Sequence, residues 1–516
     1  MTTAQIAIVT TMVVYLLGMI AVGFFYSGSG GNNSTDFYLG GRKLGPIVTA
    51  MSAEASDMSS WLLMGLPGVA YFTGLADATW TAVGLALGTY LNWLLVSKRL
   101  RLYSAKINAI TVPGFIAARF KDESGLLRGI AAAIIILFFV PYTASGFAAV
   151  GKLFHSLFGF DYVTSMMVGA AVIIIYTILG GFMAVSITDL IQSIVMTVAL
   201  IVIFAFGVNV AGGWDHVVAN ARSIPGYLKL TKLGNISTRE SSPYGFISIV
   251  STMAWGLGYF GMPHILLRFM GINDAEKLKL SRRIATIWVV ISMGVAVTIG
   301  MIGYAASTTG AIELFSSSSA AEAVVIRLAD LLSTHGILAA IIAGLVLSGI
   351  LACTMSTADS QLLAASSSAS EDILVGVFGM KLSQKATMWV ARTTVVLISL
   401  VAVFFARNPD SSVFAIVSFA WAGFGATFAP VILAALFWSR SNKWGAFAGM
   451  LSGAVMVFAW KYLVRPLGGA WDIYELLPAF IVAVVSIVVV SMLTKAPDDD
   501  MVSIFNEVLI DKKSSK

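Results

Sequence analysis

Residues 52–68 read SAEASDMSSWLLMGLPG and lie within a stretch, 45–74, that is otherwise apolar enough to cross a bilayer. Glu54 and Asp57 are costly in hydrocarbon, where no water solvates a carboxylate. A Gly-Leu-Pro sequence follows at 65–67, and interior glycine and proline cost a helix about 1 and about 3 kcal/mol relative to alanine. We therefore expect an interrupted membrane helix whose polar groups find partners or ligands inside the protein.

The composition is that of a polytopic membrane protein. Of the 516 residues, 58% are hydrophobic and only 11% are charged, whereas soluble domains contain about 25% charged residues. The single cysteine excludes an intrachain disulfide. The sequence contains no P-loop, no zinc-type Cys/His cluster and no nucleophile–base motif, so we expect neither ATP-driven transport nor an enzyme.

The hydropathy pattern predicts an all-α membrane protein. A span needs about 20 apolar residues, and thirteen segments qualify: 5–26, 45–72, 77–95, 128–154, 162–181, 186–211, 244–265, 281–305, 336–370, 387–406, 412–438, 442–462 and 475–494. Residues 320–334 are amphipathic and too charged to span, so they are expected to form a surface helix. The first span lacks a basic start and a cleavage site, and is expected to be retained rather than removed as a signal peptide.

The distribution of basic residues predicts the orientation. With the N-terminus outside and the C-terminus cytoplasmic, the cytoplasmic connections hold 22 Lys and Arg residues and the outer connections hold seven. Basic residues favour the cytoplasmic side. The net charge of +6 therefore reflects topology, and a nucleic-acid partner is not implied.

A second interrupted helix is expected in 244–265, where WGLGYFGMP places three glycines and a proline within eight residues. The two interrupted spans are five spans apart, and an odd-numbered repeat places its two copies in opposite orientations. This pattern indicates an inverted-repeat transporter with a site at the membrane midplane. The expected units are an extra helix and cytoplasmic loop, repeat one, an extracellular loop, repeat two, and two peripheral helices with a cytoplasmic tail: 1–44, 45–211, 212–243, 244–438 and 439–516.

The interrupted helix at 52–68 frees backbone carbonyls around Ala55 and Met58, and oxygen ligands suit small hard cations such as sodium. A second oxygen-rich patch lies in the ninth span, where Ser356, Thr357 and Ser360 share one helical face. The alternative is that these hydroxyls only bond to the carbonyl four residues earlier.

Five segments resemble the signature motifs of the sodium:solute symporter family, in the right order and over nearly the whole chain. They are SAEASDMSSWLLMGLPG (52–68), YTILGGFMAVSITDLIQ (176–192), WGLGYFGMPHILLRFM (255–270), MSTADSQLL (355–363) and SFAWAGFGATFAP (418–430). The resemblance implies a LeuT-type fold of about 13 transmembrane helices with two inverted five-helix repeats. It implies no organic cofactor, sodium as the co-transported ion, and a bacterial inner (plasma) membrane.

The resemblance also implies a sodium site. Its ligands would be three backbone carbonyls and two hydroxyls: those of Ala55, Met58 and Cys353, and of Ser356 and Thr357. Asp57 matches an aspartate that matters for sodium affinity, either as a ligand or by holding the unwound backbone. Ser59 matches a position linked to the coupling of solute and ion.

The solute pocket implied by the resemblance is mainly aromatic. It would involve Tyr142, Trp255, Tyr259 and Pro263, with Trp421 as a secondary candidate. L-proline, the solute of the members that this chain resembles most, presents a carboxylate, an ammonium and an apolar ring. Aromatic faces suit the ring and the cation, and amides freed at a helix break can bind the carboxylate. Simple packing or an interfacial belt is the alternative for the aromatic residues.

Two positions near the pocket depart from the proline-transporting pattern. Ser60 stands where glycine is frequent, and Met262 where glutamine is frequent, so the solute could be another amino acid or a carboxylate. A second sodium site, found in some relatives, would use Asp189, Asp359 and Ser360 together with Ser356. For Asp189, the alternative is an exposed loop carboxylate or a helix cap.

The expected function is secondary active transport, with L-proline import coupled to sodium entry by alternating access. The alternatives are sodium symport of another small solute and, with less support, a transporter-like membrane sensor. Such sensors carry a signalling domain after the spans, whereas this chain ends about twenty residues after its last span. The oligomeric state and the sodium stoichiometry do not follow from the sequence.

Overall fold

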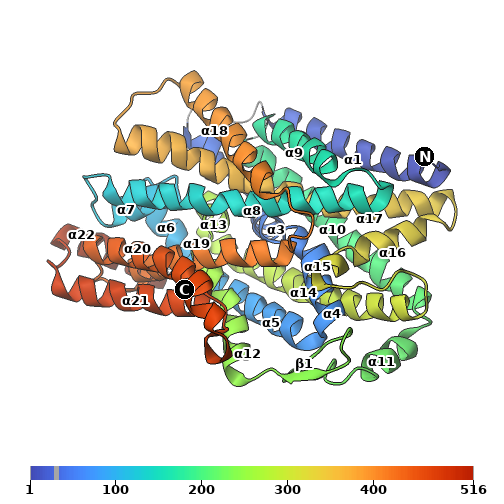
Figure 1. The fold of residues 1–516 in the computed structure, drawn as a ribbon. Coiled ribbons are helices and arrows are strands. Elements are labelled where there is room, and N and C mark those ends of the chain that lie inside the picture. The colour runs from blue at the N-terminus through green and yellow to red at the C-terminus, as the bar shows by residue number, and fades with distance from the viewer. Residues whose placement is uncertain (1, 28–33, 180, 515–516) are drawn as a thin grey trace.

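The computed structural model describes residues 2–27, 34–179 and 181–514. Its long helices run roughly parallel to one another across the molecule (Figure 1). They are α1 (Thr3–Ser27), α5 (Leu75–Leu91), α8 (Leu126–Phe158), α9 (Tyr162–Leu179), α10 (Phe182–Val210), α14 (Leu278–Thr308), α17 (Ile337–Ser367), α18 (Gln384–Phe405), α19 (Val413–Phe437), α20 (Lys443–Ala459) and α21 (Leu476–Leu493).

Nine helical stretches of the described residues are long and apolar enough to cross a membrane. The other four predicted spans fall on α5, on α9 and on the two interrupted segments. The count of thirteen therefore stays a prediction, because short or broken helices do not meet the length expected of a continuous span.

The first interrupted segment consists of α3 (Pro46–Asp57), a π-helical turn η2 (Trp61–Gly65) and α4 (Leu66–Thr73). The α-helix ends where Met58 adopts φ −76° and ψ 67°, so the break precedes the glycine and proline that predicted it. Pro67 lies after the break, where η2 continues directly into α4 with helical backbone at Gly65 and Leu66. The interruption is confirmed, and it falls at Met58, one of the two residues around which freed carbonyls were expected.

The second interrupted segment consists of α12 (Phe246–Met253), a 3-10 helix η4 (Ala254–Gly261) and α13 (Pro263–Gly271). Met262 between them is extended, with φ −76° and ψ 110°. Gly256 of η4 packs against the backbone of Gly84 and Gly88 on α5, where a Cβ atom on any of the three would overlap main-chain atoms. The glycines are thus needed for close packing of η4 against α5.

Short elements gather at the two ends of the long helices. At one end lie α6 (Ser97–Lys106), α7 (Val112–Arg119) and α22 (Asp499–Ser514); at the other, with the N-terminus, lie α11 (Trp214–Arg222) and α16 (Val324–Ser333) (Figure 1). The helix expected at 320–334 is present as α16, although its apolar side is buried.

The remaining elements are short. They are α2 (Ser34–Leu39), η1 (Gly40–Arg42), η3 (Asn92–Val96), η5 (Ala275–Lys277), α15 (Ser318–Ala321), η6 (Ser368–Val377), η7 (Trp460–Val464), η8 (Arg465–Leu467), η9 (Gly469–Trp471), and the antiparallel strands β1 (Lys232–Gly234) and β2 (Ser241–Pro243), which pair Leu233 with Ser242.

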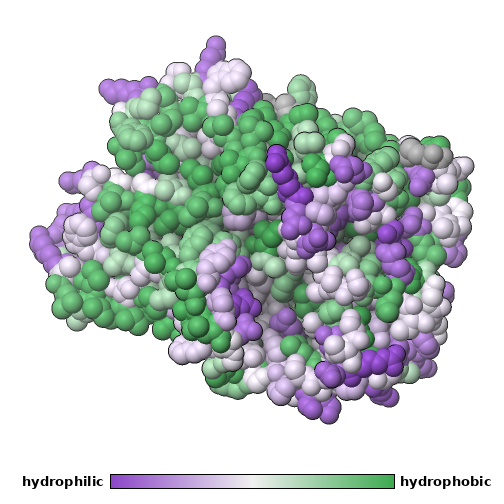
Figure 2. Space-filling model, in the orientation of Figure 1, coloured by the Kyte–Doolittle hydropathy of each residue, from purple (hydrophilic) through white to green (hydrophobic). Residues whose placement is uncertain are grey.

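Hydrophobic residues dominate the visible surface over the long helices, and hydrophilic residues gather toward the ends (Figure 2). Helix α3 lies in the interior, and every residue from Thr49 to Asp57 is buried. The polar residues of the first interrupted segment are thus enclosed by protein and shielded from lipid.

Candidate functional site

The break after α3 faces helix α17. The hydroxyl of Ser356 donates a hydrogen bond to the carbonyl oxygen of Ala55 (2.8 Å) and to that of Cys353 (3.2 Å). Thr357 is 3% exposed, and its hydroxyl oxygen has no partner among the described residues. Three of the five predicted sodium ligands therefore meet at one point, and the neighbouring hydroxyl is left free to coordinate an ion.

This arrangement fits a small hard cation. Backbone carbonyls and hydroxyls are its preferred donors, and a buried oxygen without a partner is rare in folded proteins. Ser356 bonds across to another helix as well as within its own, so the purely local alternative does not describe it. Met58, whose carbonyl is also a predicted ligand, is the residue at which α3 ends.

Asp57 links this region to the aromatic residues. The hydroxyl of Tyr259 donates to its Oδ2 atom, and the hydroxyl of Tyr142 lies 3.3 Å from its carbonyl oxygen. Its Oδ1 atom has no partner among the described residues. The geometry is compatible with both roles considered for Asp57, because one carboxylate oxygen is held by protein while the other is available.

The predicted pocket residues are brought together. The rings of Trp255 and Trp421 lie 6.3 Å apart and nearly parallel, and Tyr259 meets Trp421 edge-on at 5.1 Å. The indole N–H of Trp421 donates to the carbonyl oxygen of Trp255 (2.7 Å). All of them are at most 3% exposed, which rules out an interfacial belt.

The aromatic cluster also contains two residues that the sequence alone did not identify. Trp61 lies 6.1 Å from Trp255, and Tyr474, which precedes α21, stacks on the same ring at 5.3 Å. Trp61 stands inside the quoted stretch and could have been proposed. Tyr474 lies in the C-terminal region expected to be peripheral, and nothing in its local sequence places it here.

A polar cavity of about 400 Å³ opens beside this cluster, and Trp255, Phe414, Tyr474, Asp77, Arg465 and Asp472 are among its lining residues. It connects Trp255 to the loops around β2 and η9, at the end of α12. Charged side chains of both signs line this cavity, and two of them, Arg465 and Asp472, pair with each other (2.8 Å).

Asp189 is not an exposed loop carboxylate or a terminal cap. It lies inside α10 and is fully buried, and its Oδ2 atom accepts hydrogen bonds from Ser52 (2.6 Å) and from the guanidinium of Arg268 (3.1 Å). Arg268 also donates to Ser360 (2.5 Å). The alternative role proposed for Asp189 is therefore wrong, since packing against α3 and α13 covers it.

Arg268 changes the second candidate sodium site. It brings a fixed positive charge into contact with Asp189 and Ser360, while Asp359 beside them keeps an oxygen without a partner among the described residues. Arg268 stands in a quoted motif, but its reach to α10 requires the tertiary fold.

Arg42 fastens the end of the molecule where α6 and α7 lie. Its guanidinium donates to the carbonyl oxygens of Met270 (2.7 Å), Ala109 (2.8 Å) and Ser104 (3.1 Å). Burial, and secondarily the charge of Arg101, lowers its pKa to about 10. The bond to Met270 ties the end of α13, and hence the second interrupted segment, to α6.

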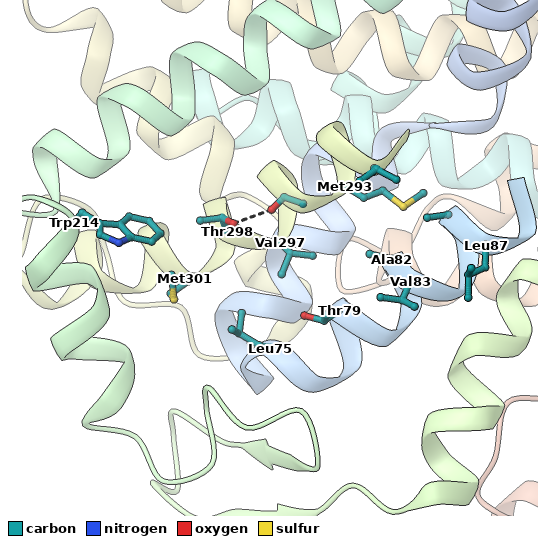
Figure 3. Close-up of a pocket in the computed structure, with 13 residues that line it drawn as sticks. Leu75, Thr79, Ala82, Val83, Leu87, Trp214, Met293, Val297, Thr298 and Met301 are labelled. Carbon is teal, nitrogen blue, oxygen red and sulfur yellow. Dashed lines mark hydrogen bonds between the residues drawn. The ribbon is translucent and has the colours of Figure 1, made fainter. Parts of the chain in front are cut away.

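A larger groove is unsuited to ions. It measures about 580 Å³, lies between α5 and α14 with Trp214 at one side, and is lined almost entirely by apolar side chains (Figure 3). The hydroxyl of Thr298 at its edge already donates to the carbonyl oxygen of Gly294 (2.7 Å). The polar cluster around α3 remains the candidate site.

The model of the sodium:solute symporter family matches residues 37–453. The chain belongs to this family. Its members are transporters that span the membrane several times, and the family assignment is consistent with sodium co-transport and with the absence of enzymatic chemistry.

Relatives match nearly the whole chain. The sodium/proline symporter of Escherichia coli K12 is 42% identical over 498 residues, covering 96% of this chain and 95% of that protein. The high-affinity proline transporter PutP of Bacillus subtilis is 41% identical over 493 residues, with 95% and 98% covered. The osmoregulated proline transporter OpuE of the same organism is 39% identical over 495 residues, with 96% of each covered.

Solved structures show the same fold. A sodium-coupled sialic acid symporter in a substrate-bound outward-open state aligns with a TM-score of 0.76 at 18% identity, covering 95% of this chain and 99% of that one. Mhp1, a nucleobase-cation-symport-1 family transporter, aligns with a TM-score of 0.55 at 14% identity, covering 92% and 99%. The fold is therefore LeuT-type, as expected.

Proposed function

We propose that this protein imports L-proline together with sodium across a cell membrane. The observation that carries the proposal is the contact of the broken end of α3 with α17, where the Ser356 hydroxyl meets the carbonyl of Ala55 at 2.8 Å. The relatives named as proline transporters, at about 40% identity over nearly the full chain, support proline as the solute.

Sodium would bind at this contact, to the carbonyl oxygens of Ala55, Met58 and Cys353 and the hydroxyls of Ser356 and Thr357. Asp57 would hold the site at the correct distance from the solute, because its side chain and its carbonyl are bonded to Tyr259 and Tyr142. Ser59, which follows in the break, is proposed to couple the two sites.

Proline would bind between the break and the aromatic cluster. Its ring would pack on Trp255 and Tyr259, whose faces also attract a cation. Its carboxylate would meet amide groups freed at the breaks, including those of the first turn of α13. Trp421 would close the far side, because its indole is already fixed to the carbonyl of Trp255.

Coupling would follow from the two helices that sodium joins. An ion that bridges α3 and α17 favours the conformation in which they are close, and it can shift the equilibrium only by its difference in affinity for the two conformations. Each sodium that crosses 100 mV contributes about 2.3 kcal/mol. Its release inside would loosen the bridge and permit opening toward the cytoplasm, where we place the C-terminus, with the N-terminus outside.

A second sodium at Asp189, Asp359 and Ser360 is proposed only as a weaker site. Arg268 already contributes a positive charge there, and one charge must balance two carboxylates. The cluster could therefore accept one more cation, against competition from the guanidinium for Asp189 and Ser360.

The test is uptake of labelled proline into proteoliposomes that contain the purified protein. We expect uptake with an inward sodium gradient and none when choline replaces sodium, because choline is too large for a site of carbonyls and hydroxyls. Uptake that is unchanged in choline would reject sodium coupling.

Another small amino acid or a carboxylate is the second candidate solute, because Ser60 and Met262 lie fully buried at the two breaks. Competition against labelled proline by a panel of unlabelled solutes separates the candidates. A panel member that displaces proline at a much lower concentration than proline itself would make that compound the solute.

A further inference from the structure

Glu54 is the one charged residue of the opening stretch that the proposed sodium and solute sites do not use. It is 1% exposed, and its Oε1 atom accepts a hydrogen bond from the indole N–H of Trp93 (2.9 Å). Its Oε2 atom has no partner among the described residues. A buried carboxylate with an unmatched oxygen is costly unless an ion or a donor is present.

Three further side-chain oxygens around Glu54 also lack hydrogen-bond partners among the described residues. Glu54 and Asp57 are three residues apart in the last turn of α3, and hence on one face. Asn92 donates its amide N–H to the carbonyl oxygen of Tyr259 (2.9 Å), and the Tyr259 hydroxyl, beside Thr89, donates to Asp57. These contacts form one cluster, and its unmatched acceptors are Glu54 Oε2, Asp57 Oδ1, Thr89 Oγ1 and Asn92 Oδ1.

The backbone presents these side chains by a local irregularity. Helix α5 changes to the π-helical turn η3 at Asn92, and such turns are frequent at functional sites. Thr89, Asn92 and Trp93 fall on one side of α5 and η3, toward the break in α3. Two independent elements, α3 and the α5–η3 helix, thus contribute buried oxygens to the cluster.

The charges of the cluster are not balanced by protein. Among the described residues, neither Glu54 nor Asp57 forms an ion pair, and both stand at the carboxyl end of α3, whose dipole disfavours negative charge. A sodium at the Ala55–Ser356 contact would offset one carboxylate. The other would be offset by a second cation or neutralised by a proton.

We propose that Glu54, Asp57, Thr89 and Asn92 bind an additional sodium ion, distinct from the sites at Ser356 and at Asp189. The inference rests on the proposed sodium coupling and adds a site to it. Carboxylate, amide and hydroxyl oxygens are the donors that hard cations take. One proton on each carboxyl would also match the four acceptors in two pairs, and the number of sodium ions bound distinguishes the two arrangements.

The experiment measures how many ²²Na⁺ ions bind per purified protein molecule at saturation, in detergent or nanodiscs. Glu54→Gln keeps the shape and removes the charge, and Thr357→Val removes a ligand of the Ser356 site. We expect Glu54→Gln to bind one ion fewer than the wild type, and Thr357→Val to bind the same number with one site weakened by about tenfold. The double variant should show both changes. A Glu54→Gln protein that binds as many ions as the wild type overturns the proposal, as does one whose lost ion is the ion that Thr357→Val weakens.

A second pair of variants makes a smaller change in side-chain structure, so that misfolding can be separated from loss of a ligand. Thr89→Val removes one proposed ligand and is expected to raise the sodium dissociation constant of this site severalfold. Thr81→Val is its control, because Thr81 is also buried on α5 with an unmatched hydroxyl but lies two helical turns from the cluster. Equal sodium affinity in the two variants contradicts the proposal.

Failure of the additional sodium site can be distinguished from failure of the proposed symport. Sodium-driven proline uptake by the wild type, with an unchanged ion count in Glu54→Gln, rejects the additional site and keeps the symporter. Wild-type uptake that ignores sodium rejects the symporter itself.

Discussion

The two interrupted segments share a break in the helix, but different side chains surround the two breaks. The break after α3 is polar, with two carboxylates and several hydroxyls, and it lies against the hydroxyls of α17. The break before α13 is made of glycines and aromatic rings, and it lies against α5 and α19. An unwound helix frees main-chain groups in either case, and the neighbouring side chains decide whether the space suits an ion or an organic ring.

Arg268 joins the two segments, so its loss should have the largest effect. It lies on α13, after the second break, and its Nε atom donates to Ser52 on α3 (3.0 Å) while it pairs with Asp189. Removal of one partner from a buried ion pair costs about 3–5 kcal/mol. Arg268→Gln should therefore markedly lower the melting temperature of the purified protein and abolish transport.

The control for this prediction is the double variant Arg268→Gln, Asp189→Asn, in which position 189 no longer carries a buried charge that has lost its partner. It should recover part of the lost melting temperature. A double variant less stable than Arg268→Gln would show that the pair is not the source of the effect.

A change confined to the second break should affect the solute more than the ion. A Cβ atom on Gly258 would overlap the indole nitrogen of Trp421, so Gly258→Ala should displace that ring. We expect proline affinity to fall by at least about tenfold, or about 1.4 kcal/mol, measured by binding of labelled proline, while ²²Na⁺ binding is retained. Gly294→Ala is the control, because a Cβ atom there meets nothing within 4 Å.

A change beside the first break should affect the ion more than the solute. Thr357→Val removes an unmatched buried hydroxyl and should raise the sodium concentration needed for half-maximal uptake by about tenfold, equivalent to about 1.4 kcal/mol. Thr354→Val is the matched control one turn earlier, where the hydroxyl donates to the carbonyl of Ile350 (2.9 Å). The contrast between the breaks would fail if both variants shifted the sodium dependence equally.

The smallest effect is expected at Met262, which tests whether the second break also tunes specificity. Met262→Gln restores a side chain frequent in the proline-transporting pattern at a fully buried position. We expect the Michaelis constant for proline to change by less than about fivefold, or roughly 1 kcal/mol. A larger decrease would indicate that proline is not the preferred solute of the natural sequence.

Local signals predicted much of this architecture. Runs of apolar residues identified the helices, and the polar or glycine-rich stretches identified both interruptions, because helix formation and burial depend on neighbours in sequence. The first break falls at Met58, before Gly65 and Pro67, because the chain stays helical through both of those residues. The family motifs, and not periodicity, supplied the roles of Ser356 and Thr357.

Long-range contacts could not be predicted in this way. Arg268 and Asp189 are 79 residues apart, and Trp255 and Tyr474 are farther still. Their meeting depends on how the helices pack, which the local sequence does not specify. The same holds for Glu54, whose surroundings on α5 became apparent only with the fold.

The Ser356 hydroxyl is both a donor and an acceptor, and this has a consequence for the return half of a transport cycle. In the empty carrier, the buried carbonyl of Ala55 still needs a hydrogen-bond donor. A rotating O–H can supply it with a hydrogen, then swing away and offer a lone pair when the metal arrives. One side chain would thus keep the loaded and unloaded forms close in free energy, which a carrier that must turn over repeatedly requires.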